Sequence, residues 1–184
     1  NHVRMANLSV HASHTVNGVS ALHSDIIKRS IFKEFYNLTP NKFTNVTNGI
    51  AHRRWLHQSN PRLSKLLDET IGHEWYSDAS NLKKFRVYED DVNVLNELAE
   101  IKYQNKCDFA NRLYNKQGVV IDPKTRFDVQ VKRLHAYKRQ LLNVLKIITL
   151  YNTLVENPNA DITPQIYIFG AKAAPAYTIA KDII

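Results

Sequence analysis

Cysteine and glycine are scarce in this chain of 184 residues, and their scarcity excludes several classes of protein. Cys107 is the only cysteine, so an internal disulfide framework and a zinc site built from several cysteines are both excluded. Five glycines and six prolines are too few for a collagen-like or low-complexity chain. No stretch approaches the roughly 18 uninterrupted apolar residues of a transmembrane helix, so we expect no membrane span. What remains is an ordinary globular composition, with 43% hydrophobic and 23% charged residues.

The ends of the chain suggest a piece of a longer protein. The sequence begins at Asn1 without a methionine and stops at Ile184 inside an apolar-periodic stretch. Its first residues lack the charged and apolar regions of a secretory signal, so we expect a cytoplasmic location. At about 150 residues per domain, the length corresponds to one domain or slightly more.

Basic residues outnumber acidic ones, with 25 Lys and Arg against 17 Asp and Glu, which gives a net charge of +8. Such a surplus points weakly to a polyanionic partner, whether nucleic acid, anionic lipid or a phosphate ligand. The distribution of the cations along the chain is more informative than their sum.

The pattern of apolar residues changes near the middle of the chain. In the first part we predict a short strand, a turn, three helices and one loop: strand 3–13, turn 14–18, helix 19–35, loop 37–49, and helices 61–71 and 91–114. In the second part we predict strand 126–131, helix 134–155, loop 157–164, strand 165–169 and the start of a helix at 175–184. A strand–helix–strand order of this length is a βαβ unit, so the two strands should be parallel and the fold class α/β.

Four cations stand close together where the first of these strands ends and the next helix begins. They are Lys132, Arg133, Lys138 and Arg139. Ligands of open α/β sheets bind outside the carboxyl ends of the strands, and a helix N-terminus there attracts anions. On a helix starting at residue 134, Arg133 and Tyr137 would share one face. The pattern therefore favours a phosphate site over its alternative, a solvated basic helix start, because cations at a helix N-terminus are unfavourable without an anion.

Three other features carry weaker signals. Asn48-Gly49 is a turn signal, and an Asn amide can both donate to and accept from a sugar hydroxyl, although the residues alone favour an ordinary turn with a half-buried Trp. His11 and His14 are three residues apart, but no carboxylate or HExxH pattern accompanies them, so we expect no metal site. Lys172 follows the second strand, where we interpret it as part of a turn rather than of an anion site.

Four segments, taken in this order, resemble the pyridoxal-phosphate-dependent α-glucan phosphorylases, the glycogen and maltodextrin phosphorylases. The segments are MANLSVHASHTVNGVSALHSDIIK from Met5, TNGIAHRRWL from Thr47, FDVQVKRLHAYKRQLLNVLKIITLYN from Phe127 and FGAKAAPAY from Phe169. The resemblance implies two Rossmann-like domains of the glycosyltransferase-B type with the active site between them. Residues 1–48 would be the end of the N-terminal domain, and residues 49–184 the start of the C-terminal, cofactor-phosphate domain.

The resemblance also assigns roles to individual residues. Lys132 and Lys138 match lysines that line the phosphate region, with catalytic and cofactor-binding roles. Arg133 matches the arginine that holds the substrate phosphate. Tyr137 matches a tyrosine beside the sugar and cofactor, Asn48 an asparagine that binds glucosyl hydroxyls, and Trp55 a tryptophan near the cofactor ring. The implied partners are an α-1,4-glucan and inorganic phosphate, with no nucleic acid and no membrane, and the implied full-length enzyme is a homodimer that releases glucose 1-phosphate.

The chain departs from the family pattern in two places. Ala51-His52 stands where the family often has Thr-Pro before Arg-Arg-Trp. The segment resembling EASGTGNMK, which carries the lysine that binds the cofactor, does not occur in this sequence. We therefore expect the fragment to be inactive by itself. The alternative hypothesis is a small basic nucleic-acid-binding module, which the aromatic and basic runs at 53–55 and 83–86 fit only loosely.

Overall fold

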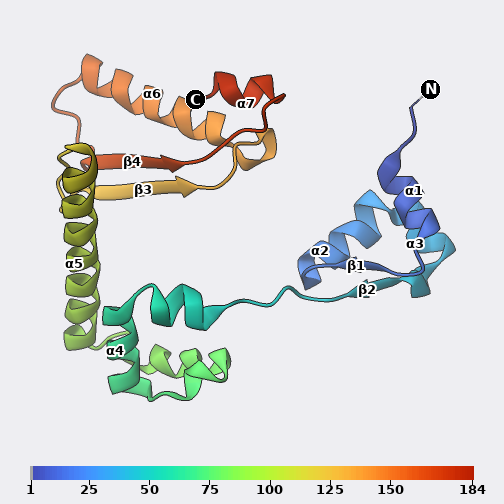
Figure 1. Ribbon diagram of the computed structural model, residues 1–184, viewed down its shortest axis with the longest axis horizontal. Helices are drawn as coiled ribbons and strands as arrows, with labels where there is room; N and C mark the ends of the chain where they lie inside the picture. The colour runs from blue at the N-terminus through green and yellow to red at the C-terminus, as the bar shows by residue number, and fades with distance from the viewer. Residues whose placement is uncertain (1) are drawn as a thin grey trace. The chain divides into compact units, whose positions relative to one another are not determined.

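The computed structural model describes residues 2–184 and divides the chain into two compact units, Asn1–Phe85 and Arg86–Ile184 (Figure 1). Small parallel strand pairs combine with helices in both units, so the chain is of the mixed α/β kind. The boundary after residue 48 concerns the domains of the longer family members and stays a prediction. In residues 2–184, no helix is long and apolar enough to cross a membrane.

The first unit begins with a pair of short parallel strands and the helices packed on it. The elements are α1 (Met5–Ala12), β1 (Val16–Gly18), α2 (Ala21–Ile26), a π-helical turn (Ile27–Ile31), α3 (Lys33–Leu38), a 3-10 turn (Pro40–Lys42) and β2 (Phe43–Asn45). The strands pair in parallel with Val16 opposite Phe43. Val10, Ile27 and Phe43 are buried together and form the core of this part.

Three predictions for this region were wrong. The segment 3–13 contains a helix rather than a strand, because Val10 packs on Ile27 and Phe43. The strands β1 and β2 lie inside the predicted turn and loop, where long-range pairing outweighs the local turn signals. The single helix predicted over 19–35 is divided by the π-helical turn.

The close packing of β1 against α2 depends on a glycine. A Cβ atom at Gly18 would lie 2.6 Å from the backbone nitrogen of Ser24, which is far inside van der Waals contact. The Ser24 hydroxyl donates to the Ser20 carbonyl at 2.8 Å and lies 2.6 Å from Oδ1 of Asn45. This serine therefore links the start of α2 to the end of β2.

The remainder of the first unit is helical. It contains a π-helical segment (Arg53–Gln58), α4 (Pro61–Ile71) and two 3-10 segments (Glu74–Tyr76 and Ala79–Tyr88), the last of which reaches residue 88. The predicted helix 61–71 is confirmed. The Asn60 side chain caps it by accepting from the Leu63 N–H, Pro61 occupies its first turn, and Gly72 ends it at φ 78°.

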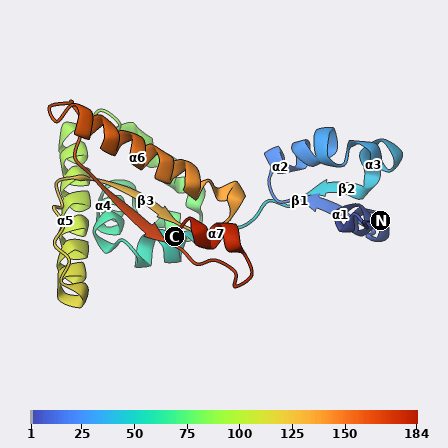
Figure 2. The ribbon, with the colours of Figure 1, turned by 90° about the horizontal axis from the view of Figure 1, so that it is seen from above.

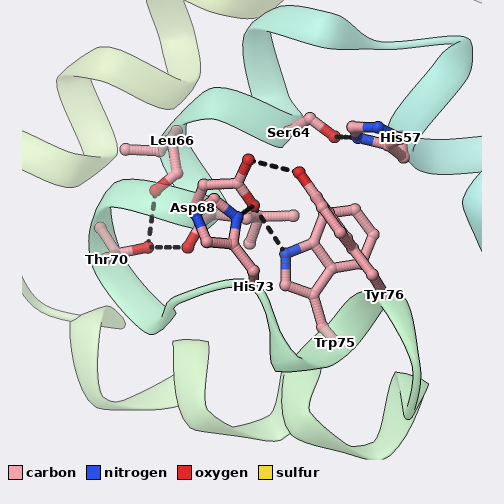
Figure 3. A network of polar contacts seen from close by, with 9 residues as sticks. His57, Ser64, Leu66, Asp68, Thr70, His73, Trp75 and Tyr76 are labelled. Carbon is pink, nitrogen blue, oxygen red and sulfur yellow. Dashed lines mark hydrogen bonds and ion pairs between the residues drawn. The ribbon is translucent and has the colours of Figure 1, made fainter.

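Figure 3 shows a polar network around Asp68 that holds α4 to the following turn. The Asp68 carboxylate accepts from the indole N–H of Trp75 at 3.1 Å and from the hydroxyl of Tyr76. His73 Nδ1 lies 3.2 Å from the same carboxylate. Trp75 is fully buried, so the hydrogen bond satisfies an indole N–H that is shielded from water.

The second unit contains the predicted βαβ arrangement. Its elements are α5 (Val92–Gln117), β3 (Arg126–Val131), a 3-10 turn (Ala136–Lys138), α6 (Gln140–Glu156), β4 (Gln165–Gly170) and α7 (Thr178–Asp182). The strands β3 and β4 pair in parallel, with Arg126 opposite Gln165, which confirms the prediction. In Figures 1 and 2, α6 runs alongside the strand pair. Lys146 of α6 forms an ion pair with Asp128 of β3.

The predicted start of the helix after β3 was wrong. The helix begins at Gln140 and not at Leu134, because the chain after β3 first pairs with the chain after β4. The Lys132 N–H donates to the Gly170 carbonyl at 3.0 Å, and the Leu134 N–H donates to the Lys172 carbonyl at 3.1 Å. These bonds hold residues 132–134 beside the segment after β4, and the left-handed backbone conformation of Arg139 separates this loop from the helix. The apolar stripe predicted for this helix is half exposed in α6, whose only buried residue is Gln140.

Candidate functional site

The candidate site is the loop 132–139, which leaves the carboxyl end of β3 and enters α6. The bonds to Gly170 and Lys172 place it beside the chain that leaves the carboxyl end of β4. The 3-10 turn Ala136–Lys138 then reverses the loop, and Arg139 adopts a left-handed backbone conformation with φ 61° before the helix starts. The loop therefore occupies the edge of the sheet where α/β proteins bind ligands.

A pocket of about 410 Å³ opens between these two segments. Its lining comes from both of them and consists of Arg133, Leu134, His135, Tyr137, Lys138, Lys172, Ala173, Ala174 and Pro175. The charged side chains in this lining are all cations: Arg133, Lys138 and Lys172. A pocket of this size with only basic charges suits a small anion.

The three cations of this pocket are not neutralised by carboxylates. Over residues 2–184, none of them forms an ion pair. Lys138 Nζ instead lies 5.4 Å from the centroid of the Tyr137 ring. Three uncompensated positive charges around one pocket repel each other, and an anion bound between them would relieve that repulsion.

Aromatic rings line the pocket beside the cations. The His135 ring lies 4.3 Å from the Tyr137 ring and 5.1 Å from the Tyr177 ring, measured between centroids. The backbone N–H of Ala136 donates to the Tyr177 hydroxyl at 3.0 Å, which ties the 3-10 turn to the segment after β4. Tyr137 remains 70% exposed, so its ring is free to contact a ligand.

The structure brings together three of the predicted site residues and adds one. Arg133, Tyr137 and Lys138 line the pocket, whereas Lys132 does not and presents an exposed side chain at the end of β3. Arg133 and Tyr137 do not share a helix face, because neither belongs to α6. Lys172 lines the same pocket, and its position after a strand parallel to β3 was the signal that could have identified it.

Asn48 and Trp55 belong to the first unit. The Asn48 N–H donates to the Val19 carbonyl at 3.0 Å. Trp55 lies in the π-helical segment, and 64% of its surface is exposed. Two neighbouring side chains bind this segment to the Tyr76 carbonyl. His52 Nε2 lies 3.2 Å from that oxygen, and Arg53 donates to it at 2.9 Å. His52, one of the two residues that depart from the family pattern, therefore helps to fasten the segment that carries Trp55. Among residues 2–184, no group of three or more His, Cys, Asp and Glu side chains could hold a metal ion.

Comparison with known proteins identifies the family of the chain. The family model for carbohydrate phosphorylases matches residues 1–184. The chain belongs to this family.

Curated glycogen phosphorylases are identical to the chain at about half of the aligned positions. Over 182 residues it is 50% identical to glycogen phosphorylase of Chlamydia pneumoniae, 49% to the muscle form of Oryctolagus cuniculus and 49% to glycogen phosphorylase of Bacillus subtilis. Each alignment covers 99% of this chain but only 22–23% of the relative. The chain thus spans between a fifth and a quarter of the length of these phosphorylases.

The family membership also bears on the alternative hypothesis. A nucleic-acid-binding module finds no support, because the match to carbohydrate phosphorylases extends over the whole chain. The cations at the end of β3 therefore have to be explained in a carbohydrate phosphorylase.

Proposed function

We propose that the protein containing this chain is an α-1,4-glucan phosphorylase, which transfers the terminal glucosyl unit of a glucan to inorganic phosphate. In this reaction a phosphate oxygen forms a bond to the anomeric carbon, the glycosidic bond breaks, and the proton that the phosphate loses goes to the leaving glucan oxygen. The products are glucose 1-phosphate and a glucan shortened by one unit. The observation that carries the proposal is the pocket bounded by the unpaired cations Arg133, Lys138 and Lys172.

The chemistry of phosphorolysis requires such a pocket. Inorganic phosphate carries between one and two negative charges near neutral pH, and it has to approach the sugar in a partly water-excluded site. Fixed cations lower the free energy of a charged transition state more than mobile water does, because they need not reorganise during the reaction. Arg133 can bind two phosphate oxygens with its planar guanidinium, whereas Lys138 and Lys172 act as point charges.

The roles of the individual residues follow the family resemblance. We assign Arg133 to the substrate phosphate, and Lys132 and Lys138 to the phosphate region that substrate and cofactor share. Tyr137 borders the sugar and the cofactor, Asn48 binds glucosyl hydroxyls, and Trp55 lies near the cofactor ring. The position of Lys172 in the same pocket adds a further phosphate-binding cation that the resemblance alone did not suggest.

We propose pyridoxal 5'-phosphate as the cofactor of the full-length enzyme. The donor set around the pocket fits its phosphate group, since Lys138 and Lys172 are unpaired and no carboxylate lines the pocket. When bound, the cofactor phosphate supplies a group that exchanges a proton with the substrate phosphate. The residues of this chain bind and orient the two phosphates and reduce the repulsion between them. The lysine that binds the cofactor covalently would lie outside residues 1–184.

The architecture and setting of the full-length protein are also proposals. We infer two Rossmann-like domains of the glycosyltransferase-B type, with residues 49–184 at the start of the C-terminal one. The parallel pair of β3 and β4 with α6 between them in sequence supports a Rossmann-like unit. We further propose a cytoplasmic homodimer.

The test is a product assay on the full-length protein loaded with pyridoxal phosphate. With an α-1,4-glucan and inorganic phosphate, we expect glucose 1-phosphate as the product and no release of glucose. Without phosphate, turnover should stop. Glucose released at the same rate with and without phosphate would identify a hydrolase and refute the proposal.

A further inference from the structure

Gln140 is a buried polar residue on an otherwise half-exposed helix. Only 2% of its surface is accessible, whereas the apolar side chains of α6 are half exposed. Burial of an amide is unfavourable unless its donor and acceptor groups find partners. The sequence therefore places at the first position of α6 a side chain that has to be held by specific hydrogen bonds.

The partners of Gln140 are backbone groups of the phosphate-site loop. Its Nε2 donates to the Arg133 carbonyl at 3.0 Å, and its Oε1 accepts from the His135 N–H at 3.5 Å. The residue between these two, Leu134, is buried beside Gln140. One amide thus fixes the peptide groups on both sides of Leu134 and, with them, the origin of the Arg133 side chain.

A second amide fixes the other end of the same loop. Gln130 of β3 donates to the Lys138 carbonyl at 3.0 Å, and its Oε1 accepts from Nδ2 of Asn143 at 3.0 Å. The backbone carbonyls of two of the predicted phosphate ligands, Arg133 and Lys138, are therefore bound by glutamine side chains. No predicted role in catalysis or binding falls on either glutamine.

We propose that Gln140 is a positioning residue for phosphate binding, acting through the backbone of Arg133. This inference rests on the proposed function and specifies how the loop is held. An amide is required because it supplies a donor for one carbonyl and an acceptor for one N–H at the same time. An apolar residue of similar size would leave both groups unpaired, and a carboxylate would face the Arg133 carbonyl with a second acceptor.

The first experiment compares steady-state kinetics of the full-length enzyme and its Gln140→Met variant. We expect the KM for phosphate to rise about tenfold to a hundredfold, the scale of displacing a binding group by roughly 1 Å, while the KM for glucan stays unchanged. The matched control is Gln104→Met, because Gln104 is a half-exposed glutamine of the same unit that bonds only to Glu100 on its own helix. An unchanged phosphate KM in Gln140→Met would overturn the proposal.

A double-mutant cycle separates positioning from a general loss of stability. In an Arg133→Ala background, Gln140→Met should have little further effect on phosphate KM, because the residue it positions is gone. A full additional effect would show that Gln140 does not act through Arg133. Should Gln140→Met not fold, Gln140→Glu keeps the acceptor for His135 and removes only the donor to Arg133. It should raise the phosphate KM in the same way, and normal phosphate binding in this variant would refute the proposal.

The outcome also distinguishes this inference from the proposed function. If the unsubstituted enzyme releases no glucose 1-phosphate, the proposed function fails and the inference with it. If that enzyme is active and Arg133→Ala weakens phosphate binding, but both Gln140 variants behave normally, only the positioning role fails.

Discussion

Asp68 shows how one carboxylate can organise the packing of several aromatic side chains. It accepts hydrogen bonds from Trp75 and Tyr76 and lies beside His73, and the His57 ring packs 4.4 Å from the Tyr76 ring. The same turn supplies the Tyr76 carbonyl that binds His52 and Arg53. The network therefore reaches from α4 to the segment that carries Trp55, the residue that we predict to lie near the cofactor ring.

Tyr76→Phe should lower the melting temperature of the protein by a few degrees at pH 8, since it removes the hydrogen bond to Asp68. That hydrogen bond raises the pKa of Tyr76 above its ordinary value of 10.0. A raised tyrosine pKa stabilises the fold below the unfolded pKa, and this contribution is lost as the pH rises through the folded pKa. The difference between wild type and variant, measured by thermal denaturation, should therefore shrink above pH 10. A difference that grows with pH would contradict the assignment.

Lys172 is the cation that the structure adds to the candidate site, since it lines the same pocket as Arg133 and Lys138. Substitution by alanine in the full-length enzyme should raise the KM for phosphate several-fold, because one of the three pocket cations is removed. The control is Lys116→Ala, which removes an exposed lysine from the last turn of α5. Equal phosphate kinetics in the two variants would show that Lys172 belongs to a turn and not to the site.

At the scale of secondary-structure elements, local signals predicted the elements whose ends are marked by capping residues. Pro61 and Gly72 delimit α4, and Asp91 and Gly118 cap α5. The alternation Phe127, Val129 and Val131 identified β3. The elements that were missed depend on distant partners: α1 on Ile27 and Phe43, and the 132–139 loop on the segment after β4. Lys132, Arg133 and Lys138 stand close together in the sequence and could be grouped from it, whereas Lys172 joins Arg133 and Lys138 only through the pairing of β3 with β4.

The cap of α5 gives a quantitative test at this scale. Gly118 has φ 70°, in the left-handed region that favours glycine. No neighbouring atom lies within 4 Å of the position that a Cβ would take there, so an alanine would be disfavoured by its backbone conformation and not by a steric clash. We expect Gly118→Ala to lower the free energy of unfolding by about 1 kcal/mol in urea denaturation. Gly49→Ala is the control, because Gly49 also has open space around it but no positive φ. An equal effect of the two substitutions would argue against a left-handed cap.

At the scale of the whole molecule, the chain is a small part of a larger architecture. A single helix cannot cover both faces of a strand pair. Large apolar side chains therefore stay half exposed, among them Leu141, Leu145 and Ile148 of α6. The relatives are more than four times as long as the aligned region. We expect the longer protein to cover this apolar surface with further elements of the sheet.

The most direct test of the account is the phosphate dependence of glucose 1-phosphate release by the full-length enzyme and its Arg133→Ala variant. Arg112→Ala, on the exposed surface of α5, serves as the control. If the loop between β3 and α6 binds phosphate, Arg133→Ala should raise the KM for phosphate and reduce turnover by several-fold to about a thousand-fold, the scale of losing one charge-stabilising group. Arg112→Ala should leave both unchanged. Unaltered phosphate kinetics in Arg133→Ala would contradict the account.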